Sequence, residues 1–156
     1  MGYDSRASTI TNTSSEKIYD VLFLGQLNDR RKKIIEKLEQ RGLTCYMPGN
    51  CFGKDRLEAV ARSKIVINVH YYEQAILETV RLSFLLTQGA CIVSETSCDE
   101  VLDHQYKKYC KLVDYDKLVD ETIEAVRDRE ALEKIRLGVL LFQSAETKLP
   151  FDSIDV

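Results

Sequence analysis

Short apolar runs alternate with amphipathic stretches along the chain from Tyr19 onwards. The runs are of strand length and rich in Val, Ile and Leu, which is typical of strands buried on both faces. They predict five strands, at residues 20–25, 43–47, 64–70, 90–94 and 109–113. The apolar residues of the other stretches recur at helical spacing and predict helices at residues 28–41, 55–62, 75–87, 99–102, 116–127 and 130–144.

This alternation predicts an α/β fold, a Rossmann-like three-layer domain with a mostly parallel five-stranded sheet. We expect the strand order 3-2-1-4-5, with a switch point between the first and fourth strands. In such sheets, ligands bind outside the carboxyl ends of the strands. The residues that follow the strands are therefore the first candidates for a functional site.

The two ends of the chain differ from its middle. Seven of the eleven residues from Ser5 to Ser15 are Ser or Thr, which is typical of a linker. We predict a flexible linker or tail at residues 1–18, the Rossmann-like domain at residues 19–145 and a C-terminal tail at residues 146–156.

Composition narrows the class of protein. Apolar residues make up 44% of the chain and charged residues 30%, which indicates a globular protein. A net charge of −3 argues against a nucleic-acid partner, and no apolar run reaches the roughly 20 residues of a membrane span. Residues 1–16 lack the apolar run of a signal peptide. The five cysteines show no C-x-x-C spacing, so we expect no disulfide framework, no metal site and a cytoplasmic location.

The turn after the first predicted strand carries the first candidate residues, Gly25, Asn28, Arg30 and Arg31. The glycine-rich patterns of dinucleotide sites and P-loops are both absent. Two arginines at the start of a helix are unfavourable because the helix dipole is already positive there. A bound phosphate would offset this cost. The alternative is that these cations form a solvated face.

Polar and aromatic residues also follow the third and fourth predicted strands. His70, Tyr71, Tyr72 and Glu73 come after the third strand, and Glu95 ends the fourth. Tyrosine rings offer a flat face and a polar tip to a base or sugar. A lone histidine at the end of a strand is also often only packed, so both interpretations of His70 stay open.

Glu78 and Arg81 interrupt the most apolar of the predicted helices. They are three residues apart and therefore share one face of that helix. One interpretation is an internal salt bridge. The other is that Glu78 accepts hydrogen bonds from ribose hydroxyls while Arg81 binds phosphate.

Four of these segments also carry a family resemblance. Residues 20–31 read D-V-x-F-x-G-x-x-x-x-R-R, residues 77–81 read L-E-x-x-R, and residues 68–72 and 89–95 cover two strand ends. Together they resemble the C-terminal, donor-binding half of GT-B glycosyltransferases, in the family-1-like or CgeB-like group. The resemblance extends from Tyr19 to about Ser144.

The resemblance implies that this chain binds a nucleotide-diphosphate sugar for glycosyl transfer. In that group the sugar nucleotide is a donor substrate, there is no cofactor, and a bound metal is generally not needed. Arg31 and Arg81 would hold the phosphates, Glu78 the ribose, and residues 70–73 the base or sugar. The acceptor would bind to an N-terminal domain or partner chain that this sequence lacks.

The sequence departs from that group at one motif. Ile76 and Phe84 stand where retaining enzymes of this fold carry two glutamates. The stereochemical outcome and the catalytic residues therefore stay open. The alternative function is a non-catalytic nucleotide-binding or protein-interaction module of the same Rossmann or flavodoxin-like type.

Overall fold

Five parallel strands form the centre of the structure, a computed structural model that describes residues 16–148. The strands are β1 (Tyr19–Leu24), β2 (Cys45–Gly49), β3 (Ser63–Asn68), β4 (Ile92–Glu95) and β5 (Lys111–Val113). They form one sheet in the order β2-β1-β3-β4-β5, and every neighbouring pair is parallel. The predicted α/β class and the parallel five-stranded sheet are confirmed.

The strand order corrects the predicted order 3-2-1-4-5 at two strands. β3 lies between β1 and β4, and β2 forms an edge. β3 is almost fully buried, whereas every residue of β2 is half-buried and one of them is Pro48. Proline cannot donate to a strand ladder, which favours an edge position. The switch point therefore lies between β1 and β3.

The register of β2 adapts to its proline. The pairing of β1 with β2 shifts between Leu22 and Leu24. After this shift, the carbonyl oxygen of Gly49 accepts a hydrogen bond from the backbone nitrogen of Gly25. Alternate residues of a parallel strand face the same neighbour, so Pro48 faces the open edge of the sheet.

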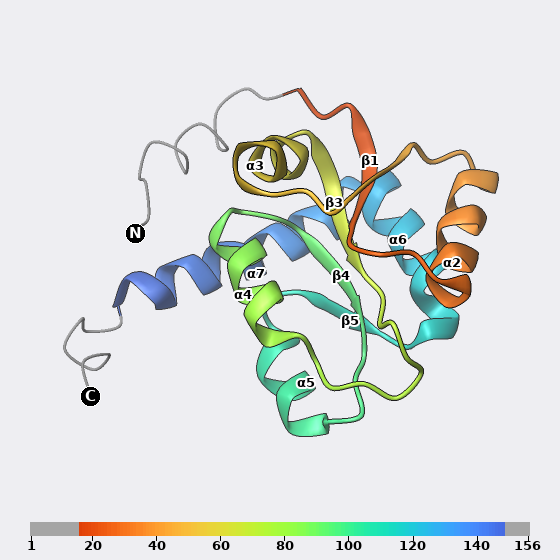
Figure 1. Cartoon of the computed structure of the whole chain (residues 1–156). Coiled ribbons are helices and arrows are strands. Elements are labelled where there is room, and N and C mark those ends of the chain that lie inside the picture. The colour runs from red at the N-terminus through yellow and green to blue at the C-terminus, as the bar shows by residue number, and fades with distance from the viewer. Residues whose placement is uncertain (1–15, 149–156) are drawn as a thin grey trace.

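Helices cover both faces of the sheet (Figure 1). α2 (Asp29–Gln40) and α6 (Leu118–Arg127) lie on one side and contact each other. α3 (Gly53–Ala61), α4 (Thr79–Thr87) and α5 (Glu100–Tyr106) lie on the other. A 3-10 turn (Tyr115–Lys117) precedes α6, and α7 (Arg129–Lys148) contacts both α6 and α4. Among residues 16–148, no helix is long and apolar enough to cross a membrane.

The core lies between the sheet and these two helical layers. Each buried large apolar side chain contributes about 1.5–3 kcal/mol relative to an exposed one. This packing fixes the ends of the central strands, where the candidate site lies. The buried side chains include Val21, Leu22, Phe23, Ile65, Ile67, Ile92 and Val93 from the strands, Ile34, Ile35 and Leu38 from α2, and Leu82, Leu85 and Leu86 from α4.

The helix predicted at residues 75–87 begins only at Thr79. Of the apolar residues just before it, Leu77 is buried in the core although it is not helical, whereas Ile76 is exposed. The carbonyl oxygen of Ala75 accepts from the backbone nitrogen of Cys98, 3.0 Å away, and is not part of a helix. Glu78 is consequently the N-cap residue of α4, not a member of its first turn.

The predicted linker at residues 1–18 and the predicted tail at residues 146–156 lie mostly outside the described residues. The last residues of the linker contact the domain. Lys17 Nζ donates to the carbonyl oxygen of Ala61 (2.7 Å), and the backbone nitrogen of Ile18 donates to that of Arg62 (2.9 Å). At the other end, α7 continues to Lys148.

Candidate functional site

A pocket of about 710 Å³ lies at the switch point of the sheet. Its lining comes from the end of β1, from residues 50–56 at the start of α3 and from residues 76–84 at the start of α4. Three of the sequence-predicted residues meet there: Gly25, Glu78 and Arg81. The pocket is therefore at the place where α/β domains of this type bind ligands.

Gly25 forms the turn that brings two arginines together. Its φ of 122° lies in the region that favours glycine. A Cβ atom at this position would lie 3.5 Å from Arg81 Nη1 and 3.8 Å from Arg31 Nη1. Arg81 Nη2 also donates to the carbonyl oxygen of Leu24. The end of β1 is thus flanked by two guanidinium groups.

Arg31 connects the end of β1 to the end of β3. The residue is only 5% exposed, and its Nε donates to the carbonyl oxygen of Val69 (2.9 Å). Its Nη1 donates to the carbonyl oxygen of Gln26 (2.7 Å), and its Cζ lies 5.2 Å from the ring centroids of both Phe23 and Tyr71. Burial lowers the pKa of this guanidinium. Two of its three guanidinium nitrogens, Nε and Nη1, therefore already have partners within the domain.

Arg81 keeps a donor without a partner. Its Nε is buried and forms no hydrogen bond with any described residue. Burial lowers its pKa, and the carboxylate of Glu78 partly offsets this effect. The ion pair with Glu78 is loose, because Arg81 Nη1 and Glu78 Oε2 are 3.5 Å apart. Arg81 can therefore bind a further anion.

Arg56 is a member of the pocket that the sequence analysis missed. Its Nε is also buried without a partner among residues 16–148, and its Cζ lies 4.8 Å from the ring centroid of Phe84. The signal was the same as for Arg30 and Arg31: a cation in the first turn of a helix that follows a strand.

Two helix N-termini face the pocket without a side-chain cap. Phe52 precedes α3 and Glu78 precedes α4, and neither side chain bonds to the backbone of its helix. Asn28 and Asp99, by contrast, cap α2 and α5. Free backbone N–H groups at a helix start suit anionic groups such as phosphate.

Arg30 and Glu95 form a separate, internal network. The two Nη atoms of Arg30 donate to the two carboxylate oxygens of Glu95, which is 4% exposed. Glu95 Oε2 also accepts from the backbone nitrogen of His70 (2.9 Å). The hydrogen bond to Glu95 raises the pKa of Arg30. Arg30 Cζ lies 4.1 Å from the ring centroid of Tyr115, so this arginine is fully engaged.

His70 belongs to the same network. The residue is 1% exposed, and its Nε2 lies 3.0 Å from the carbonyl oxygen of Thr96. Because that oxygen only accepts, Nε2 carries the proton. The Nδ1 atom is buried without a partner among the described residues. The structure therefore places His70 as a packed residue behind the surface, not in the pocket.

The remaining predicted residues lie near Arg31 on the outer surface. Asn28 Oδ1 caps α2, and its Nδ2 donates to the carbonyl oxygen of Tyr71 (2.7 Å). The rings of Tyr71 and Tyr72 meet edge to face at 4.9 Å. Both tyrosines and Glu73 are exposed, and none of them lines the large pocket.

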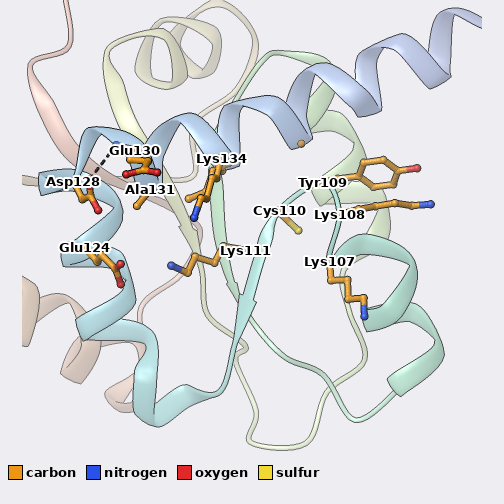
Figure 2. A pocket seen from close by; sticks show the side chains of 12 residues that line it. Lys107, Lys108, Tyr109, Cys110, Lys111, Glu124, Asp128, Glu130, Ala131 and Lys134 are labelled. Carbon is orange, nitrogen blue, oxygen red and sulfur yellow. Dashed lines mark hydrogen bonds between the residues drawn. The ribbon is translucent and has the colours of Figure 1, made fainter.

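A second pocket, of about 330 Å³, lies at the opposite edge of the sheet, where β5 begins (Figure 2). Four lysines line it together with three carboxylates. Lys107 and Lys108 point away from Lys111 and Lys134 (Figure 2). Lys111 Nζ also pairs with Glu121 Oε2 at 2.5 Å. Its cations do not converge, and Lys111 already has a carboxylate partner, so the pocket at the switch point is the stronger candidate.

Comparisons with known proteins find similar proteins in a virus. No family model matches the chain. It is 32% identical over 117 residues to "Uncharacterized protein L138" of Acanthamoeba polyphaga mimivirus, a match that covers 73% of this chain and 13% of the relative. It is 31% identical over 111 residues to L140 and 29% identical over 121 residues to L137 of the same virus. These matches cover 69% and 74% of this chain, and 36% and 16% of L140 and L137. The chain is thus similar to a segment of longer mimivirus proteins.

Proposed function

We propose that this chain binds a nucleotide-diphosphate sugar as the donor-binding part of a glycosyltransferase. The observation that carries the proposal is the pocket at the switch point, which Arg56 and Arg81 line and where each has a buried Nε without a partner among residues 16–148. Two guanidinium groups beside two uncapped helix N-termini suit the phosphates of a nucleotide. The resemblance to the donor-binding half of GT-B enzymes supplies the reaction class.

The pocket residues would take distinct roles. Arg81 and the start of α4 would bind the phosphate nearest to the glycine turn, since Gly25 leaves the backbone open to close approach. Glu78 would accept hydrogen bonds from the ribose hydroxyls. During transfer, the same cations would stabilise the negative charge that develops on the leaving diphosphate. Arg31 would support the site from behind, because its own hydrogen bonds are made within the domain.

Isothermal titration of the full chain against UDP, GDP, ADP and CMP tests the proposal. We expect saturable binding of at least one nucleoside diphosphate, reduced by Arg81→Met and unchanged by Lys134→Met. Lys134 is a control because it lines the pocket at the opposite edge of the sheet. If none of the four nucleotides binds to the wild-type chain, the proposal is wrong.

A binding-only module is the second candidate. Within residues 16–148, Glu78 is the only carboxylate that lines the pocket, and it already pairs with Arg81. This arrangement offers ligand contacts without an evident general base. Binding of a nucleotide without any hydrolysis or transfer of its sugar, even with an acceptor domain supplied, would favour this candidate.

A further inference from the structure

Arg56 is a charged group that the domain itself leaves uncompensated. Among the described residues it has no ion-pair partner and no hydrogen-bond acceptor, and its Cζ lies 4.8 Å from the ring centroid of Phe84. The exposed arginine at the C-cap of the same helix, Arg62, pairs with Glu58 at 3.0 Å. The buried Nε of Arg56 is costly, since its N–H group loses water and gains no partner in exchange.

Arg56 also faces a like charge. Burial lowers its pKa, and the positive charge of Arg81 lowers it further. Both side chains line the same pocket, and the single carboxylate there, Glu78, lies beside Arg81. Two cations on one pocket wall repel each other unless an anion lies between them.

The contact with Phe84 fixes where Arg56 points. An arginine that lies over an aromatic ring keeps its planar group parallel to a surface and its edges free for hydrogen bonds. Phe84 belongs to α4, so the contact holds the first turn of α3 beside the first turns of α4. Arg56 and Arg81 are therefore presented together to a ligand in the pocket.

We propose that Arg56 forms a second anion subsite in this pocket, which binds the phosphoryl group farther from the glycine turn, while Arg81 and Gly25 bind the nearer one. That this group belongs to a nucleotide rests on the function proposed above. The subsite itself requires only a ligand with two linked phosphates. It predicts that diphosphates bind more tightly than the corresponding monophosphates, and that this preference depends on Arg56.

The test compares inorganic pyrophosphate, inorganic phosphate, UDP and UMP by isothermal titration of the full chain. Arg56→Met keeps an apolar stem over Phe84 and removes the donors. We expect it to weaken binding of pyrophosphate and UDP about tenfold, which is the loss of one charge-assisted hydrogen bond, and to leave UMP unchanged. Arg56→Lys should lose less, because it retains the charge. Arg62→Met, at the C-cap of the same helix, is the matched control, and it should change none of the affinities.

The possible results separate this subsite from the proposed function. Unchanged affinities for pyrophosphate and UDP in a folded Arg56→Met chain would overturn the subsite, even if nucleotides bind. Binding of pyrophosphate that depends on Arg56, with nothing gained from a nucleoside, would support the subsite and overturn the nucleotide function. Thermal melts of both Arg56 variants identify any loss of folding, and Arg56→Lys provides the comparison if Arg56→Met unfolds.

Discussion

Glu95 is the carboxylate on which the end of the sheet depends. It is buried at the end of β4 and binds the guanidinium of Arg30 and the backbone of His70. A buried ion pair that loses one partner leaves the other charge uncompensated.

We predict that Arg30→Met lowers the free energy of unfolding by about 3–5 kcal/mol, because Glu95 then stays buried without a cation. Urea denaturation measures this change. The control is Lys32→Met on the same helix, whose pair with Glu36 is exposed and 3.9 Å long, and which should cost less than about 1 kcal/mol. Equal losses in the two variants would show that the Arg30 network is not structural.

Glu78 is expected to act on the ligand and not on folding. Its side chain is 35% exposed and forms no hydrogen bond to the backbone of α4, although Glu78 stands at the N-cap position. Its ion pair with Arg81 is 3.5 Å long. We predict that Glu78→Gln weakens nucleotide binding by about 1–3 kcal/mol, the scale of a lost hydrogen bond to a charged group. The melting temperature without ligand should change little.

Thermal melts and titrations of Glu78→Gln, with Glu58→Gln as a control on α3, check this prediction. Glu58 is an exposed carboxylate outside the pocket. A variant that melts far below wild type without ligand, yet is stabilised normally by nucleotide, would remove Glu78 from the binding site.

The candidate residues show what a sequence conveys about a site and what it does not. The positions of Gly25, Glu78 and Arg81 after buried strands were sufficient to predict that they would lie at one edge of the sheet. Arg30 and Arg31 were equally good candidates by position. However, Arg30 binds Glu95, and Arg31 binds the carbonyl oxygens of Val69 and Gln26. Such partners come from distant segments, so no local pattern reveals that an arginine is already engaged.

At the scale of elements, α7 shows how closely a helix approaches the sheet. Gly138 lies in α7, and a Cβ atom there would be 2.5 Å from the carbonyl oxygen of Lys108. That oxygen belongs to the backbone just before β5 and cannot rotate away. A glycine in the middle of this helix is therefore needed for packing, although it weakens the helix by about 1 kcal/mol relative to alanine.

We predict that Gly138→Ala destabilises the protein by about 1–2 kcal/mol, because overpacking costs more than the gain in helix propensity. Leu140→Ala, at an exposed position of the same helix, should change stability by less than about 0.5 kcal/mol. Denaturant midpoints of the two variants give the comparison. A stabilised Gly138→Ala chain would mean that α7 lies farther from the sheet.

The start of α4 is the element that periodicity described least well. Ala75, Ile76 and Leu77 continue the apolar pattern of the helix, so the sequence predicts a helix from residue 75. The carbonyl oxygen of Ala75 accepts from the backbone nitrogen of Cys98 instead. Because of this long-range hydrogen bond, the helix begins only at Thr79. Periodicity reports which side chains are buried, and burial is common to a helix and to a loop that lies on the core.

At the scale of the whole molecule, Pro48 indicates where β2 lies in the sheet, and this residue can be identified from the sequence alone. The apolar runs predict five strands correctly. The expected order 3-2-1-4-5 is that of one doubly wound topology, and the observed order is that of the other. Pro48 and the lower hydrophobicity of β2 mark an edge strand, while the Ile-Val-Ile run of β3 marks a central one. Weighing these two features would have favoured the observed order.

The chain should bind nucleotide diphosphates more readily than it transfers sugar. Transfer requires closure of an acceptor-binding part over the reacting atoms, and the residues of the proposed donor site all lie at one edge of a single sheet. We predict saturable nucleotide binding with no measurable transfer to glycan acceptors by this chain alone. Assays with a radiolabelled donor check this, and transfer at the rate of ordinary enzymes would contradict it.

The position of Pro48 also affects how these molecules behave next to one another. An open sheet exposes two rows of backbone hydrogen-bonding groups, and a strand of a second chain can extend the sheet at either row. At one row, Pro48 withholds a donor from any incoming strand. The other row belongs to β5, which is three residues long and begins with a lysine. The two edges are thus poor templates for edge-to-edge aggregation, so a strand of a second molecule should not extend this sheet readily.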